Sequence, residues 1–80
     1  MTLSERNTRR AEMYMRLMSP GLYYSSREVY EMACRQVSYN FQPKNTNAVS
    51  GVLGWAARHG QLSRIGTPGR YRYGLVEVNA

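Results

Sequence analysis

Residue types that catalytic and metal sites require are scarce in this chain of 80 residues. It contains no Asp, a single His at position 59 and a single Cys at position 34. The missing Asp excludes a Ser-His-Asp triad and metal sites that depend on Asp. One Cys permits neither a disulfide within the chain nor a zinc site built from several thiolates. We therefore expect no catalytic residues, no metal and no cofactor.

The remaining candidates for site chemistry have simpler structural explanations. His59 precedes Gly60 at the expected end of a helix, where an imidazole meets the carbonyl end of the helix dipole. Cys34 falls on the apolar face of an expected helix and is predicted to be a buried small hydrophobe. Gly66-x-x-Gly69 has the spacing of a turn and lacks the strand-loop-helix context of a phosphate loop.

Long hydrophobic runs are also absent. No apolar segment approaches the roughly 20 residues that a membrane-spanning helix needs. The first ten residues, MTLSERNTRR, have no apolar stretch after their charges and do not resemble a secretory signal. Together with the single Cys, this pattern predicts a protein of the reducing cytoplasm with no membrane partner.

Positive charge is abundant. Eleven Lys and Arg face five acids, which gives a net charge of +6 and an isoelectric point near 10.0, and ten of the eleven cations are Arg. Arg suits bidentate contacts to phosphate and guanine better than Lys does. Such charge can serve solubility alone. We favour nucleic acid because Arg64, Arg70 and Arg72 cluster in a segment with no acid before Glu77.

The first half of the chain predicts two capped helices. Thr2-x-x-Glu5 is a capping box, and the helix that it opens runs to about Met18 before Ser19-Pro20-Gly21. Its core face holds Ala11, Tyr14, Met15 and Met18. Met13 and Leu17 form a second apolar strip, which packs either on the same chain, the commoner outcome, or against a second subunit in a homodimer.

The next segment predicts a short strand and a second helix. Leu22–Tyr24 follows Pro-Gly and is expected to pair with the edge of a later hairpin. Ser25-x-x-Glu28 is a second capping box, so a helix begins near Ser26 and runs to about Val37. Its predicted core face consists of Val29, Tyr30, Ala33, Cys34 and Val37. The linker 38–44 follows, with Tyr39 and Phe41 expected to anchor it in the core.

A third helix is predicted over Asn45–His59, with Asn45 or Thr46 as its cap because Pro43 disfavours helix before it. Its period places these apolar residues on one side: Ala48, Val49, Val52, Leu53 and Ala56. The other side carries small and polar residues, namely Thr46, Asn47, Ser50, Gly51, Gly54 and Arg58. Each Gly costs about 1 kcal/mol of helix stability relative to Ala, which favours close approach by DNA or by another helix.

The remaining segment predicts an antiparallel hairpin. Strands are expected at Leu62–Ile65 and Arg70–Leu75, joined by a turn over Gly66–Gly69. Residues 76–80 either extend the second strand or fray. Tyr71 and Tyr73 alternate with the arginines and are expected to pack in the core or on the sheet. The arginines themselves contact DNA or, alternatively, keep an exposed strand edge solvated.

Three motifs in this order resemble the winged helix-turn-helix domains of bacterial or phage transcription regulators. They are Val49-x-x-x-Leu53, His59-Gly60-x-Leu62-x-Arg64 and Gly69-Arg70-Tyr71-Arg72-Tyr73, and the resemblance covers roughly residues 22–76. It implies one α+β domain with the order helix, strand, helix, helix, strand, strand. Residues 1–21 would form the N-terminal helix and turn, 22–60 the helix-turn-helix core and 61–76 the wing.

The resemblance implies sequence-specific binding of double-stranded DNA, as in a small transcription regulator associated with the nucleoid. Helix 45–59 would enter the major groove, and the wing, 62–75, would contact the backbone or minor groove. The alternative is a winged helix that serves as a protein–protein adaptor or inhibitor. The expected DNA contacts are Arg27, Lys44, Asn45, Thr46, Asn47, Ser50, Gly51, Gly54, Arg58, Arg64, Thr67, Arg70 and Arg72.

Overall fold

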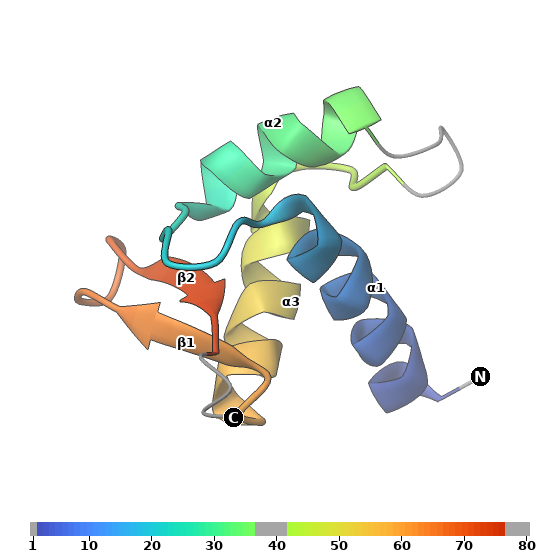
Figure 1. Cartoon of the computed structure of the whole chain (residues 1–80). Coiled ribbons are helices and arrows are strands. Elements are labelled where there is room, and N and C mark those ends of the chain that lie inside the picture. The colour runs from blue at the N-terminus through green and yellow to red at the C-terminus, as the bar shows by residue number, and fades with distance from the viewer. Residues whose placement is uncertain (1, 37–41, 77–80) are drawn as a thin grey trace.

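The computed structural model describes residues 2–36 and 42–76 (Figure 1). Three helices, α1 (Leu3–Leu17), α2 (Ser26–Gln36) and α3 (Thr46–Arg58), precede the antiparallel strands β1 (Leu62–Ile65) and β2 (Arg72–Leu75). Helix α3 lies in the middle, between α1 and the hairpin, and α2 crosses beside its N-terminal end. This α+β arrangement of three helices and a C-terminal hairpin is consistent with a winged helix. None of the described helices has the length and apolar character to cross a membrane.

Side-chain caps fix the start of each helix, as the sequence predicted. The backbone N–H of Glu5 donates to Thr2 Oγ1 at 3.2 Å. Ser25 and Glu28 form the full reciprocal box, with each backbone N–H donating to the other side chain at 3.1 Å. Asn45, rather than Thr46, caps α3 by accepting the backbone N–H of Ala48 at 2.8 Å. These contacts satisfy N–H groups that a helix leaves without partners in its first turn.

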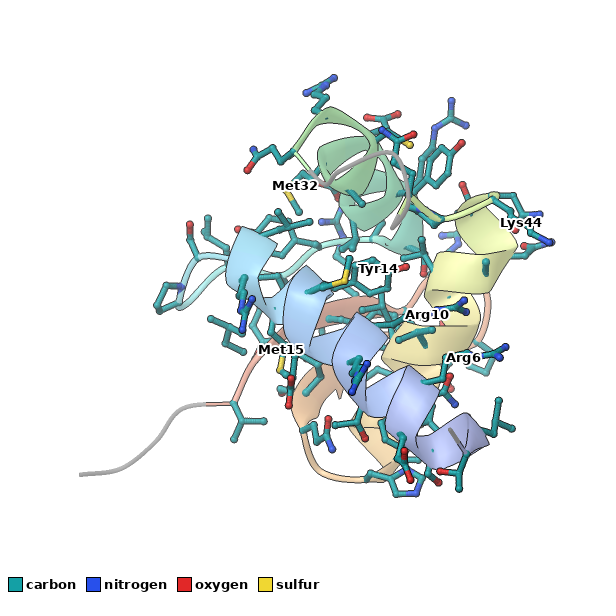
Figure 2. All side chains as sticks on the ribbon, turned by 90° about the vertical axis from the view of Figure 1, so that its right-hand side faces the viewer. Arg6, Arg10, Tyr14, Met15, Met32 and Lys44 are labelled. Carbon is teal, nitrogen blue, oxygen red and sulfur yellow. The ribbon has the colours of Figure 1, made fainter. Side chains whose placement is uncertain are left out.

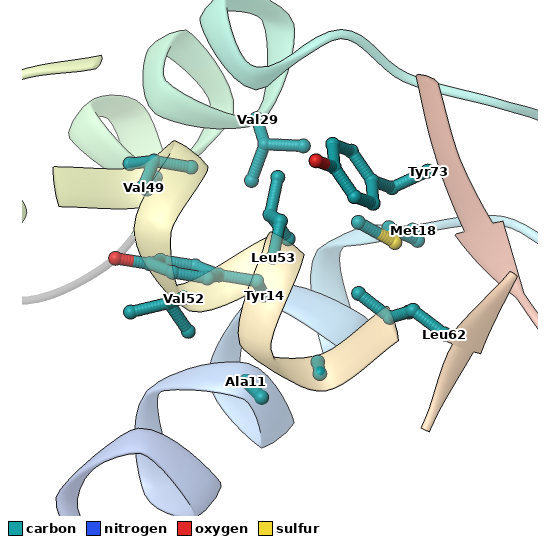
Figure 3. Close-up of a cluster of buried hydrophobic side chains, with 11 residues drawn as sticks. Ala11, Tyr14, Met18, Val29, Val49, Val52, Leu53, Leu62 and Tyr73 are labelled. Carbon is teal, nitrogen blue, oxygen red and sulfur yellow. The ribbon is translucent and has the colours of Figure 1, made fainter. Parts of the chain in front are cut away.

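The core forms where the three helices and the hairpin meet (Figure 3). Leu53 of α3 is at its centre and is fully buried. Tyr30 and Cys34 are only half-buried, so the core face of α2 is narrower than predicted, and Cys34 lies at its margin. Val37, Tyr39 and Phe41 lie outside the described residues. The buried residues are Ala11, Tyr14, Met18, Val29, Ala33, Val49, Val52, Leu53, Ala56, Leu62 and Tyr73.

The predicted strand at Leu22–Tyr24 is wrong as a regular strand. Only Tyr24 pairs with β2, through two backbone hydrogen bonds of 2.8 Å with Tyr73. The segment is too short to form a strand, because the residues at its two ends have other hydrogen-bonding roles. The N–H of Leu22 donates to the Ser19 carbonyl in the preceding turn, and Ser25 already caps α2. Only Tyr23 and Tyr24 are left between these two residues, and a single bridge at Tyr24 is too short for a ladder.

The hairpin follows the predicted pairing with one difference. Leu62 lies opposite Leu75, and Ile65 lies opposite Arg72, so β2 begins two residues later than the predicted Arg70. The N–H of Arg70 donates to the Thr67 carbonyl at 2.8 Å, and Gly69 has a φ of 84°. Pro followed by a left-handed Gly is the pattern of a type II turn. Arg70 therefore closes the turn and is not part of the strand.

Replacement of Leu53 by Ala should destabilise the fold by about 2–5 kcal/mol, because the side chain is fully buried at the point where α3 meets both other helices and the hairpin. Thermal or chemical denaturation measures the change. The same replacement at Leu3, which is 71 % exposed, is the control and should alter stability little. A Leu53 variant with an unchanged midpoint would contradict this description of the core.

Candidate nucleic-acid interface

A groove of about 440 Å³ separates the first half of α3 from the hairpin. We call it the wing groove. Its lining comes from three segments: the start of α2, the polar side of α3 and the turn and second strand of the hairpin. The lining residues are Ser25, Ser26, Arg27, Thr46, Asn47, Ser50, Gly69, Arg70, Tyr71, Arg72 and Tyr73.

Six of the predicted DNA contacts meet in the wing groove. The structure brings Arg27 of α2 and Arg70 and Arg72 of the wing around three polar residues of α3, Thr46, Asn47 and Ser50. Sequence reasoning missed Ser25, Ser26 and Tyr71 as part of this surface. The capping box at Ser25 was recognisable, but nothing local in the sequence indicates that the start of α2 faces the wing.

Arg72 is held by contacts within the chain, although the sequence showed no acid near it before Glu77. Its Nη1 lies 3.0 Å from Glu28 Oε1 and also donates to the Tyr23 carbonyl at 3.2 Å. Hydrogen bonds from Ser25, first the backbone N–H, and the charge of Arg72 hold the pKa of Glu28 below its usual value. Glu28 is therefore ionised at neutral pH, and Arg72 joins the wing to α2.

The other arginines near this groove differ in the contacts that their side chains make within the chain. Arg27 forms an exposed pair with Glu31 at 3.3 Å, one helical turn away. Arg64 stacks over the ring of Tyr71, 4.2 Å from its centre. Arg70 is exposed in the turn, and within residues 2–36 and 42–76 its side chain makes no ion pair. Arg70 is therefore the wing cation most available to an external anion.

The polar side of α3 is fully exposed only along a strip formed by Asn47, Gly51 and Arg58. This exposed strip is narrower than the predicted polar side, because Gly54 is buried. A Cβ at Gly54 would lie 3.9 Å from the Tyr73 hydroxyl and 3.5 Å from Arg58 Nη1. Gly54 therefore cannot be a direct contact point, since Tyr73 of the wing and the side chain of Arg58 cover it. Gly51 has open space around it and lies on the exposed strip with Asn47 and Arg58.

The remaining predicted contacts lie outside the wing groove. The side-chain oxygen of Asn45 is occupied by the cap of α3. Thr67 is exposed in the hairpin turn, and Arg64 is exposed on β1. His59 ends α3 as predicted: its Nδ1 donates to the Trp55 carbonyl at 2.8 Å. Its ring also stacks on Trp55 with 4.4 Å between centroids.

A second groove, of about 410 Å³, lies between α1 and the start of α3. We call it the α1 groove. Lys44, predicted as a phosphate contact, belongs to this groove and not to the wing groove. Met13 also lines it, whereas Leu17 packs against the core of its own chain. The lining residues are Arg6, Arg10, Met13, Tyr14, Gln42, Pro43, Lys44 and Ala48.

Comparisons of the chain with protein-family models, with curated protein sequences and with solved structures returned no match.

Replacement of Gly51 by Ala should stabilise the protein by about 1 kcal/mol, because the position is inside α3 and a Cβ there meets no other atom within 4 Å. Thermal denaturation measures the gain. The matched control is Gly60→Ala, which is equally open but has a φ of 73° and should therefore be destabilised. A Gly51 variant that is less stable than the parent would show that this face of α3 is not open.

Proposed function

We propose that this protein is a sequence-specific double-stranded DNA-binding protein of the winged-helix type, acting as a small bacterial or phage transcription regulator. Helix α3 lies in the major groove, and the wing contacts the sugar–phosphate backbone. The observation that supports this proposal best is the wing groove, where polar residues of α3 lie beside Arg27, Arg70 and Arg72.

The exposed strip of α3 suits contact with base edges. Asn forms paired hydrogen bonds with adenine, and Ser and Thr adapt to several bases. Asn47 is exposed, and Thr46 and Ser50 are partly exposed beside it. Gly51 adds no side chain, so the backbone of α3 can approach the floor of the DNA groove closely. A bulkier residue there would hold α3 away from the bases.

The cations around this strip suit contact with phosphate. Arg70 projects from the turn of the wing without an acidic partner among the described residues, and Arg27 is 82 % exposed despite its pair with Glu31. An exposed ion pair contributes about 0–1 kcal/mol, so a phosphate can compete with Glu31 for Arg27. Arg72 is more firmly held and mainly positions the wing.

A protein–protein adaptor is the rival function, and it predicts an apolar surface on α3. The exposed residues of this helix are instead Asn47, Gly51 and Arg58. Exposed apolar side chains do occur at Leu22 and Ile65, outside the surface of α3. The charge and polarity around α3 therefore support DNA over a protein partner.

The experiment compares base-reading and phosphate-contacting variants in the same duplex titration. Asn47→Ala and Ser50→Ala should each cost about 1–3 kcal/mol at one position of a preferred site. Arg70→Ala should weaken binding to all duplexes similarly, because a phosphate contact carries no sequence information. It should also make the slope of log affinity against log salt shallower by about 0.9.

Two controls sharpen this test. Arg35→Ala removes the same charge from an exposed position of α2 that lines neither groove, so its salt slope should stay close to that of the parent. The Gly51→Ala variant should bind DNA more weakly than the parent although its fold is more stable.

Absence of duplex binding by the parent at low salt would reject the proposal and favour the protein-partner function. A changed base preference in Arg70→Ala would show that the wing reads sequence.

A further inference from the structure

The α1 groove is a second strongly basic surface beside α3, and no predicted DNA contact except Lys44 belongs to it. We propose that the α1 groove holds the phosphate backbone of the second strand of the same duplex, with Arg6 and Arg10 as the contacting residues beside Lys44. The inference rests on the proposed function. It extends that function from one backbone contact, at the wing, to two backbones on opposite sides of α3.

Three cations from two segments converge on this groove. Arg6 and Arg10 are four residues apart in α1 and therefore share one face of that helix. Lys44 approaches from the other side, directly before the cap of α3. Figure 2 shows Arg6, Arg10 and Lys44 following one another along the seam between α1 and α3. All three residues are exposed, so their charges are accessible to an extended anion.

No acid lines the α1 groove, and the four acids within the described residues lie elsewhere. Glu5 and Glu12 line a different surface of α1, together with Arg9. Glu28 and Glu31 are on α2, each paired with an arginine. Helix α1 therefore keeps both of its glutamates away from the groove, whereas two of its four arginines line it. This separation gives the groove a positive potential that an even mixture of charges would cancel.

The tyrosine that lines the α1 groove is uncharged at neutral pH. Tyr14 lines the groove, although its ring belongs to the core. Burial raises the pKa of Tyr14 despite the opposing effect of the Arg10 charge. The hydroxyl therefore remains protonated at neutral pH, and Tyr14, which is 2 % exposed, adds no negative charge to the groove. Ala48 lines the groove from α3 and also carries no charge.

The position of the two grooves matches the geometry of a helix inside a major groove. Asn47 lines the wing groove and Ala48 lines the α1 groove, one residue or about 100° further round α3. Gly51 falls between them on the exposed strip. The major groove is about 12 Å wide, and a helix with its side chains is about 10–12 Å across. A helix that fills the groove therefore has one phosphate backbone on each side.

The test measures the salt dependence of binding to random-sequence duplex DNA. The double variant Arg6→Ala/Arg10→Ala should bind more weakly, and its slope should be shallower than that of the parent by about 1.8, or about 0.9 for each lost phosphate contact. The matched control is Arg9→Ala/Arg16→Ala, which removes two charges from the same helix outside the groove. Its slope should remain close to that of the parent. Circular dichroism checks that both variants fold.

A second variant separates a charge contact from a structural role. Arg6→Lys/Arg10→Lys keeps both positive charges and should recover the parent slope. Failure of this recovery, or equal slopes in the two Ala pairs, would overturn the inference while leaving the proposed function intact. Binding of two duplexes by one chain would also overturn it, because the α1 groove would then hold a separate molecule. Without duplex binding by the parent at low salt, the inference and the proposed function both fail.

Discussion

The anchoring of Tyr73 is the constraint on which the arrangement of the wing depends. Tyr73 is 3 % exposed, and its side chain reaches the core beside α3, where it covers Gly54. Its backbone exchanges two hydrogen bonds with Tyr24, which ties the hairpin to the segment between α1 and α2. One residue thus fixes the hairpin against two parts of the chain, α3 and the segment between α1 and α2. The distance between the wing and α3, and therefore the width of the wing groove, follows from this anchoring.

The arginines of the wing have two different roles. Two of them stabilise the fold through contacts within the chain, and one faces solvent. Arg72 is bound to Glu28 and to the Tyr23 carbonyl, and Arg64 stacks on Tyr71. Arg70, which belongs to the tight turn, lies beyond these contacts. Such a division lets the wing keep a defined position beside α3 while it presents a positive charge at its tip. A count of charges in the sequence does not distinguish these roles.

Local features of the fold could be predicted from the sequence, because their determinants lie within a few residues. Thr2, Ser25 and Asn45 each form the predicted helix cap. The hairpin pairing is also confirmed, since alternating residues and a Pro-Gly turn define it. The strand predicted at 22–24 does not form, because the N–H of Leu22 closes the preceding turn and Ser25 directly after the segment caps α2.

Features that depend on distant contacts could not be predicted in this way. Gly54 has a helical position close to the exposed strip, and the later placement of Tyr73, together with the side chain of Arg58, buries it. The spacing of Arg6 and Arg10 indicates a shared face, but the sequence does not tell which element that face meets. The same limit applies to Glu28, whose pairing with Arg72 joins residues far apart in the chain. The candidate site was therefore predictable in its residue types and only partly in its geometry.

Selection of bound sequences from a random duplex library at low salt, with the stoichiometry of the complex measured, tests the central claim most directly. We expect enrichment of a short site whose preferred bases are contiguous along one major groove, as a single inserted helix requires. We also expect each chain to bind one duplex. Recovery of no duplex, or of a pool without any base preference, would contradict the claim that α3 reads DNA.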